Sequence, residues 1–231
     1  MCIIIVNKSG TLTKEQLLRA SINNPHGAGI MWASNGKINH RKSLNNEEII
    51  AEYNRVRKEN PDVIIALHFR IMTDGGITAE NCHPYFVSKN KAGSVYLMHN
   101  GRLLSYSNRN TAKSDTRLYI ADILKHIPPG EIMQDYCLKL IQQAIGHGNK
   151  FVLMNAKGET AIVNEGAGHW HGENWYSNYS YRPILSKEAG RMPSRIKVKR
   201  RQKADYCQIC SSFLFSELER EQEICEYCDN V

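Results

Sequence analysis

Apolar residues recur along this chain in short runs, with two different spacings. Residues 2–6 form an unbroken apolar run, which predicts a buried strand. Runs of strand length and composition predict further strands over residues 29–33, 37–40, 62–70, 94–99, 150–154 and 159–164, with short strands around 168–177. Helical spacing predicts helices near residues 13–22, 46–58, 115–126 and 131–145.

Two of the predicted helices show which face should be buried. In the first helix, Leu17, Leu18 and Ile22 share one face. The last helix has the cleanest apolar stripe, formed by Ile132, Met133, Tyr136, Cys137, Leu140, Ile141, Ala144 and Ile145.

The order of elements is strands, then two adjacent helices, then strands again. This order favours an α+β fold, in which helices cover the outer faces of sheets, over an alternating βαβ pattern. We expect one globular domain over residues 1–186, a basic linker over 187–204 and a compact cysteine-rich unit over 205–231.

Composition excludes some classes of protein. No apolar run approaches the roughly 18 residues needed to cross a membrane. The first residues have a short apolar stretch with no basic segment before it, unlike a signal peptide. We therefore expect a cytoplasmic protein with no membrane association. Because that compartment keeps thiols reduced, the seven cysteines predict chemistry, metal binding or core packing rather than disulfides.

Cysteine at position 2 has a specific chemical meaning. Its small side chain should allow removal of Met1, which would leave a thiol and a free α-amine on one Cα. The amine has an ordinary pKa of about 7.7–8.0 and can accept the thiol proton, so the nucleophile would carry its own base. The alternative is a core residue, since a cysteine that opens an apolar strand usually packs in the interior.

Several short motifs accompany Cys2 in a fixed order. They are Met1-Cys2-Ile3-Ile4, Asn24-Pro25-His26-Gly27-Ala28-Gly29, Ala66-Leu67-His68-Phe69-Arg70, Asn81-Cys82-His83-Pro84, Met98-His99-Asn100-Gly101 and Ser114-Asp115-Thr116. In these motifs and their spacing, residues 2–180 resemble the class II glutamine amidotransferases. The resemblance implies the αββα sandwich of the N-terminal-nucleophile (Ntn) hydrolases, with Cys2 as the nucleophile.

The resemblance also implies a role for each matching residue. Arg70 would bind the α-carboxylate of glutamine, because a guanidinium matches a carboxylate with two hydrogen bonds. Asp115 would accept the α-ammonium group, and Gly27 would let the backbone approach the substrate closely. Asn100 and Gly101 would supply the amide and backbone N–H donors of an oxyanion hole.

Each role has a structural alternative. Arg70 could be a surface residue at a strand end, and Ser114 or Asp115 could cap the helix that follows. Asn-Gly is also a hairpin signal, which is how we interpret Asn35-Gly36.

Other candidate residues have weaker assignments. We expect His68, His83 and His99 to be structural, and Cys137 to lie in the core. Cys82 could line the pocket, and the glycine-bearing loop 71–84 is a candidate lid. The aromatic segment 175–181 could lie beside a ligand or pack at the domain's end.

The C-terminal cysteines form two C-x2-C pairs, Cys207/Cys210 and Cys225/Cys228. Four thiolates at this spacing predict one tetrahedral structural Zn²⁺, as in a zinc ribbon. A unit this small has no room for its own core, so the metal would have to stabilise it. The alternatives are a redox pair or unpaired thiols. A closed site of four cysteines has no open coordination position, so we assign it no catalysis.

Charge is distributed unevenly around the formal net value of +7. Residues 187–203 hold eight Lys or Arg and one acid, whereas residues 204–231 hold seven acids and one base. An acidic zinc ribbon is a poor binder of phosphates. The linker 187–203 could bind nucleic acid, fold back on the acidic tail, or simply be solvated.

Together these features predict a glutaminase that releases ammonia from glutamine and supplies it to a partner synthase. Zinc would be structural, and glutamine hydrolysis would need no cofactor. Two alternatives remain: an Ntn amidase acting on another γ-glutamyl-type amide, and a catalytically silent Ntn domain that serves as a binding module.

Overall fold

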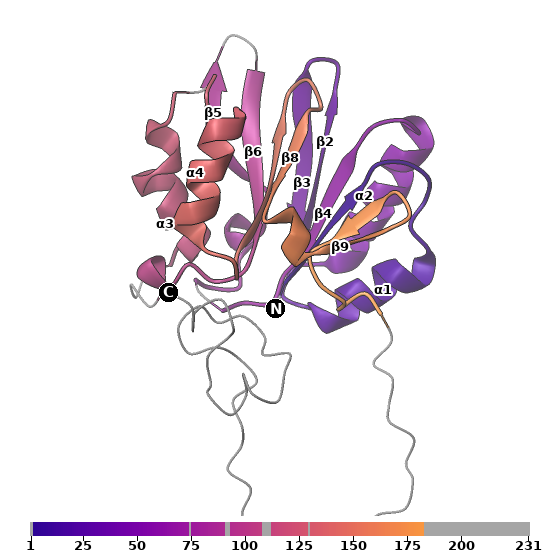
Figure 1. The fold of residues 1–231 in the computed structure, drawn as a ribbon. Helices are drawn as coiled ribbons and strands as arrows, with labels where there is room; N and C mark the ends of the chain where they lie inside the picture. Colours follow the sequence, from indigo (N-terminus) through magenta and orange to yellow (C-terminus); the bar gives the residue numbers. More distant parts are fainter. Residues whose placement is uncertain (1, 74, 91–92, 108–111, 129, 183–231) are drawn as a thin grey trace, which may run out of the picture.

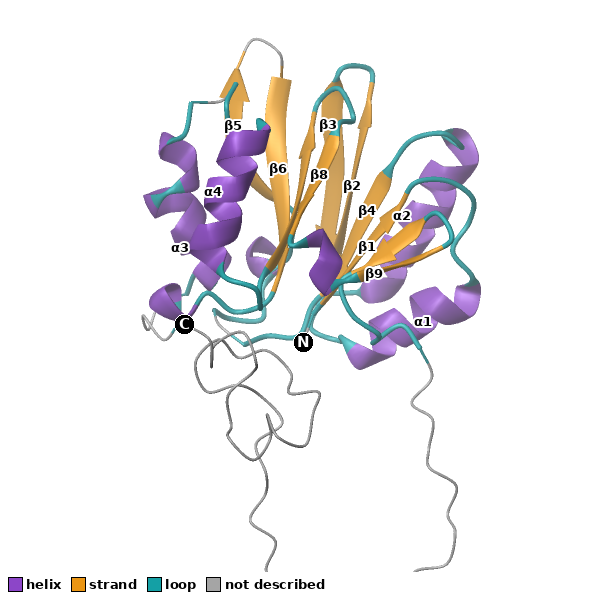
Figure 2. Cartoon of the chain, viewed as in Figure 1, coloured by secondary structure: helices purple, strands orange, loops and turns teal. Residues whose placement is uncertain are grey.

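Two antiparallel sheets face each other, and a pair of helices covers the outer side of each (Figures 1 and 2). The computed structural model describes residues 2–73, 75–90, 93–107, 112–128 and 130–182. The fold is therefore mixed α and β, with four layers in the order helix, sheet, sheet, helix.

The first sheet has six strands in the order β3-β2-β4-β1-β10-β9. Their bounds are β1 (Ile3–Asn7), β2 (Ala28–Ser34), β3 (Lys37–Ser43), β4 (Ile65–Phe69), β9 (His169–His171) and β10 (Asn174–Tyr176). The second sheet has four strands in the order β5-β6-β7-β8. They are β5 (Tyr85–Asn90), β6 (Gly93–Asn100), β7 (Lys150–Asn155) and β8 (Thr160–Val163).

The helices divide between the two sheets. The pair α1 (Lys14–Asn23) and α2 (Asn46–Glu59) covers the first sheet, and the pair α3 (Asp115–Asp122) and α4 (Asp135–Ile145) covers the second (Figure 2). Short 3-10 turns are η1 (Ala79–Asn81), η2 (Leu104–Tyr106), η3 (Leu124–His126) and η4 (Glu165–Ala167).

Alternation along the central strands explains the layers. In β1, Ile3 and Ile5 pack toward α1 and α2, while Ile4 and Val6 point into the space between the sheets. All four side chains are buried, so the unbroken apolar run at the start of the chain is that of a strand covered on both faces. A third apolar cluster fills the space between the second sheet and its helices.

The predicted strands and helices are confirmed, with differences at particular elements. No strand was expected at β5, which carries a bulge between Phe86 and Ser88. The helix expected over 115–126 ends at Asp122 and continues as the 3-10 turn η3. This tighter turn leaves Ile123 exposed and lets Leu124 lie fully buried. The last helix begins at Asp135, not at residue 131.

The predicted apolar faces were partly wrong. On α1, Leu18 and Ile22 are exposed while Leu17 is buried. On α4, Tyr136 and Leu140 are 56% and 61% exposed. Both helices lie on an outer layer and have a single neighbouring sheet, so only the centre of each stripe is covered.

In the part of the chain that the structure describes, no helix has the length and apolar character needed to cross a membrane. The linker 187–204 and the cysteine-rich unit 205–231 lie outside the described residues, as do the last residues of the expected domain 1–186.

Candidate functional site

Pairing of β1 with β4 brings the predicted nucleophile next to the predicted carboxylate-binding residue. The two strands are antiparallel, with Ile3 opposite Phe69. Cys2 directly precedes β1 and Arg70 directly follows β4, so both lie at the same end of the sheet.

The Cys2 thiol is half-buried against the backbone of Ile71. Its Sγ lies 3.2 Å from the Ile71 carbonyl oxygen, to which it donates, and 3.3 Å from the Ile71 nitrogen, which donates to it. The Asn178 side chain donates to the Cys2 carbonyl at 2.6 Å. Burial raises the pKa of the thiol, and the Ile71 hydrogen bond and the Arg70 charge oppose that rise. The neutral thiol is thus favoured, and a nearby base is needed to form the thiolate.

Arg70 is buried, with 4% of its surface exposed. Its backbone is fixed by two hydrogen bonds, from its own N–H to the Gly27 carbonyl (2.8 Å) and from His26 N–H to its carbonyl (2.9 Å). Its guanidinium donates to the Gly76 carbonyl at 3.0 Å. The loop after β4 therefore holds this cation beside the thiol.

Gly27 has a positive φ of 103°, a conformation that favours glycine. A Cβ at this position would lie 2.6 Å from Cys82 Sγ and 3.0 Å from the Ser43 carbonyl oxygen. Packing alone therefore requires glycine here, and close approach to a substrate stays a prediction.

Asn100 ends β6 and is 1% exposed. Its amide nitrogen donates to Ser177 Oγ at 2.7 Å, and the same Oγ accepts the Ile4 backbone N–H at 2.8 Å. Ser177 thus joins the end of the second sheet to the first strand of the first sheet. Within the described residues, Asn100 Oδ1 is buried and has no hydrogen-bond partner.

Gly101 follows with a φ of 147°. A Cβ here would overlap the side chain of Asn149 and lie 2.8 Å from its Cα. Asn149 is itself fixed, because its Oδ1 meets His99 Nε2 at 2.8 Å and its amide donates to the Ile145 carbonyl. The Asn100-Gly101 pair is therefore a strand end packed against Asn149 rather than a hairpin turn.

Asp115 is the first residue of α3 and is 6% exposed. Ser114 is the N-cap, and its hydroxyl accepts from Arg117 N–H. The Asp115 carboxylate accepts from the N–H of Leu103 (2.8 Å) and of Thr116 (2.6 Å). It lies near enough to Cys2 to raise the pKa of the thiol. Ser114 is thus the residue that caps α3, and the Asp115 carboxylate points toward Leu103, two residues after Gly101.

All of the residues predicted for catalysis and substrate binding, Gly27 included, lie where β1, β2, β4, β6 and α3 meet. Two contributors were not predicted, Ser177 and Asn178, which lie just after β10. The aromatic segment 175–181 was a candidate for its rings, yet its polar residues are the ones that contact Cys2, Ile4 and Asn100.

Three histidines that we expected to be structural, His68, His83 and His99, are buried. His68 and His83 have ring centroids 4.2 Å apart, and His83 and His99 are 6.4 Å apart. Burial lowers the pKa of His68 to about 3 and that of His83 well below its ordinary range. The rings of His68 and His83 are therefore neutral, and the His99 ring is held by Thr116 Oγ1 at 2.7 Å and Asn149 Oδ1 at 2.8 Å.

Metal binding has no candidate among the residues that the structure describes, where no group of three or more His, Cys, Asp or Glu could hold an ion. The described cysteines, Cys2, Cys82 and Cys137, are free thiols. Cys207, Cys210, Cys225 and Cys228 lie outside the described residues.

Comparison with known proteins finds similar solved structures, including three that are 10–20% identical to this chain. No family model matches the sequence, and no curated protein matches it. One similar structure is a glutamine phosphoribosylpyrophosphate amidotransferase from B. subtilis complexed with ADP and GMP (15% identity, TM-score 0.43). Another is described as the allosteric regulatory enzyme of purine biosynthesis (20% identity, TM-score 0.39). For both, the alignment covers 76% of this chain but 41% of the other.

A third similar structure is a glutamine aminotransferase class-II domain protein from Silicibacter pomeroyi. It is 10% identical with a TM-score of 0.32, and the alignment covers 68% of this chain and 73% of the other.

Proposed function

We propose that this protein is a glutaminase of the Ntn-hydrolase class, with Cys2 as the N-terminal nucleophile. The observation that carries the proposal is the meeting of Cys2, Arg70, the Asn100-Gly101 pair and Asp115 at one end of the two facing sheets. The proposal requires removal of Met1, since the α-amine of Cys2 is the base.

Catalysis begins when the α-amine accepts the thiol proton and Sγ bonds to the side-chain amide carbon of glutamine. The oxygen of that carbon becomes an oxyanion, which the Asn100 amide and the Gly101 N–H stabilise. The C–N bond then breaks, and the leaving nitrogen takes the proton from the ammonium of Cys2, so ammonia departs. Water attacks the remaining γ-glutamyl thioester, which restores the thiol and releases glutamate.

Recognition of the amino-acid end uses two buried charges. Arg70 binds the α-carboxylate, and Asp115 accepts the α-ammonium. Gly27 keeps the backbone close to the substrate. A binding site with both charges favours substrates with a free amino-acid head group, such as glutamine, and disfavours amides that lack one.

The use of the ammonia belongs to the proposal as well. We assign it to a partner synthase.

Cys207, Cys210, Cys225 and Cys228 would hold one structural Zn²⁺, and the linker 187–203 is a candidate nucleic-acid contact. Metal analysis of the purified full chain tests the zinc site: about one Zn²⁺ per chain supports it, and a metal-free chain contradicts it.

Steady-state hydrolysis of glutamine tests the activity. Wild-type protein should release glutamate and ammonia in equal amounts, and Cys2→Ala should reduce turnover to background. Arg70→Lys should raise KM by about tenfold or more, because the two-pronged contact with the carboxylate is lost. Arg19→Lys, on the exposed surface of α1, is the matched control and should leave both constants unchanged. Full activity of Cys2→Ala would contradict the proposal.

A further inference from the structure

A cavity of about 680 Å³ lies beside the candidate active site and is not part of it. One wall is β3 of the first sheet, and the others are η1, the start of β5, and α3. Its lining includes none of Cys2, Arg70, Asn100 and Asp115. Its volume is within the range of small-molecule sites, about 300–1,000 Å³.

Basic side chains converge on this cavity from two elements. Arg41 and Lys42 come from β3, and Arg117 comes from α3. Arg41 is paired with Glu48 at 2.9 Å. Neither Lys42 nor Arg117 has a carboxylate partner among the described residues.

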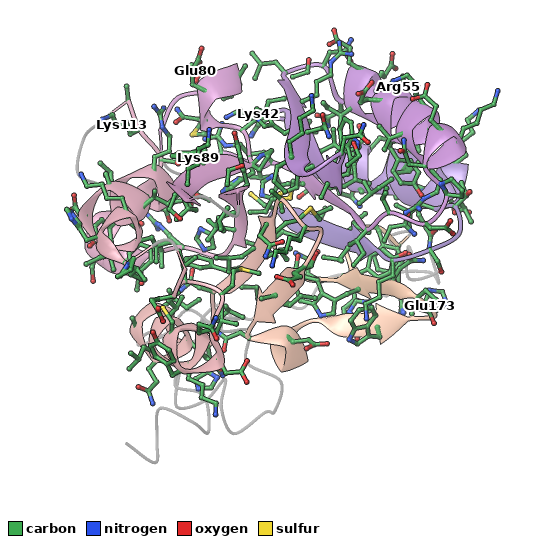
Figure 3. The ribbon with its side chains drawn as sticks, turned by 90° about the horizontal axis from the view of Figure 1, so that it is seen from above. Lys42, Arg55, Glu80, Lys89, Lys113 and Glu173 are labelled. Carbon is green, nitrogen blue, oxygen red and sulfur yellow. The ribbon has the colours of Figure 1, made fainter. Side chains whose placement is uncertain are left out.

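Lys42 and Arg117 are instead held by weak neutral contacts. Lys42 Nζ lies 3.5 Å from the Glu80 carbonyl oxygen, and Arg117 donates to Asn81 Oδ1 at 3.2 Å. Figure 3 shows Lys42 and Glu80 near each other at this end of the molecule. The Glu80 carboxylate also lines the cavity but is exposed to solvent. Burial lowers the pKa of Lys42, and the nearby Glu80 charge opposes that fall, so an anion in the cavity would further stabilise the charged ammonium.

Aromatic rings form the other part of the lining. Phe86 is 51% exposed and meets Tyr96 edge-on, with ring centroids 5.7 Å apart. The ring centroid of His40 lies 4.9 Å from that of Tyr96. An exposed ring in a cavity offers a stacking face to a flat ligand.

We infer that this cavity is a second binding site, for a small phosphate-bearing molecule with an aromatic ring, of the nucleoside monophosphate class. Arg117 and Lys42 bind the phosphate, since a guanidinium matches it with two hydrogen bonds and an ammonium adds charge. The ring of the ligand lies against Phe86 and Tyr96.

The site is connected to the candidate active site through Asn81. Asn81 Oδ1 accepts from Arg117 and from the N–H of Ser114, the cap of α3. Its amide donates to the Gly76 carbonyl at 3.2 Å, and the same carbonyl accepts from Arg70 at 3.0 Å. A ligand that draws Arg117 away from Asn81 therefore disturbs the loop that holds Arg70. This coupling rests on the proposed function, and it should change KM for glutamine.

Titration calorimetry on the full chain tests the site directly and needs no activity. AMP and CMP should bind with one site per chain, whereas inorganic phosphate and adenosine should each bind at least about tenfold more weakly, because each lacks half of the contacts. Lys42→Gln and Arg117→Gln should each weaken AMP binding by about tenfold or more, because each removes a charge-assisted contact. Lys139→Gln on the exposed face of α4 is the control and should bind AMP like wild type.

Saturable binding of neither nucleotide, or binding that both variants leave unchanged, would overturn the inference. Binding of a short single-stranded oligonucleotide without binding of AMP or CMP would also overturn it. A saturating nucleotide that leaves KM for glutamine unchanged would overturn the coupling alone. A chain that binds AMP but does not hydrolyse glutamine would contradict the proposed function and leave the second site standing.

Discussion

Asn100 and Ser177 show how single hydrogen bonds prepare the proposed oxyanion hole. One N–H of the Asn100 amide is directed at Ser177 Oγ, which sets the plane of the amide and hence the direction of its other N–H. Ser177 is in turn fixed by Ile4, two residues beyond the nucleophile. A donor held in this way needs no rearrangement when charge develops on the substrate.

Gly101 gives the sharpest prediction at the scale of one residue. Gly101→Ala should destabilise the fold by more than about 1 kcal/mol. The backbone of residue 101 has a positive φ that alanine disfavours, and the added Cβ would also clash with the backbone of Asn149. Gly36→Ala is the control, since φ there is 69° but nothing lies within 4 Å, so it should cost about 1 kcal/mol. Urea unfolding compares them, and equal losses would show that Asn149 does not restrict this position.

Motif spacing selected residues that the fold brings together in the candidate site, whereas the residues that support them could not be predicted. Cys2 and Arg70 adjoin apolar strands, so pairing of those strands was enough to bring them together. Ser177 is 173 residues from its partner Ile4, and no local pattern marks that contact. It depends on closure of β10 against β1, which only the folded chain has.

Helix α4 shows how an outer layer is stabilised at the scale of the element. The turn that precedes the helix buries Ile132 completely. The covered face of the helix is formed by Cys137, Ile141 and Ile145. Tyr136 and Leu140 flank this face and meet solvent. The apolar stripe is therefore wider than the contact that the helix makes.

Two substitutions on α4 separate its covered and exposed positions. Ile141→Ala should lower the free energy of unfolding by about 2–5 kcal/mol, because it opens a hole in the cluster under the helix. Leu140→Ala should change it by less than about 0.5 kcal/mol, since that side chain is exposed. Denaturant unfolding measures both, and similar losses would mean that Leu140 is covered in the full chain.

The helices could be predicted from their apolar spacing, whereas the strand β5 could not. Its six residues follow a loop and contain a bulge, so no regular alternation extends over them. Phe86 is exposed on this edge strand, between the buried Tyr85 and Val87. Edge strands have one partner, and their pattern is accordingly weaker than that of central strands.

Across the whole molecule, the two sheets meet through an apolar layer that ends in neutral imidazoles. The His68 ring lies on the face of β4 that meets the second sheet, 4.2 Å from the His83 ring, and its Nε2 meets the His99 carbonyl at 3.0 Å. The His99 ring lies on the other side of β6, against Thr116 and Phe151. Both ring nitrogens of His83 are buried without a partner in the described part of the chain. Protonation of His68 or His83 in the folded protein would place a charge in this buried layer, which is energetically costly.

Acid should therefore destabilise the protein through these rings. In the unfolded chain a histidine has a pKa of about 6.5, and in the fold the pKa of His68 is about 3 and that of His83 is also lowered by burial. Below pH 6.5 the unfolded state binds more protons, so stability is complete above about pH 6.5 and falls as pH decreases, by up to about 1.4 kcal/mol per pH unit for each ring.

Replacement of one ring tests this pH dependence. His83→Phe keeps a flat ring in contact with His68 and Tyr85, and it removes one titrating group whose ring nitrogens have no hydrogen-bond partner among the described residues. Urea unfolding between about pH 6.5 and 5 should show a shallower loss of stability than in wild type. His171→Gln, at an exposed position, should keep the wild-type slope. Equal slopes in wild type and His83→Phe would contradict the assignment.

The measurement closest to the central claim is the intact mass of the protein after exposure to a glutamine-analogue diazoketone. We predict a chain that lacks Met1 and carries one adduct, mapped to Cys2, with loss of dinitrogen from the reagent. Excess glutamine should prevent the adduct, Cys2→Ala should not form it, and the buried thiols of Cys82 and Cys137 should stay unmodified. Retention of Met1, or an unmodified Cys2, would contradict a role as N-terminal nucleophile.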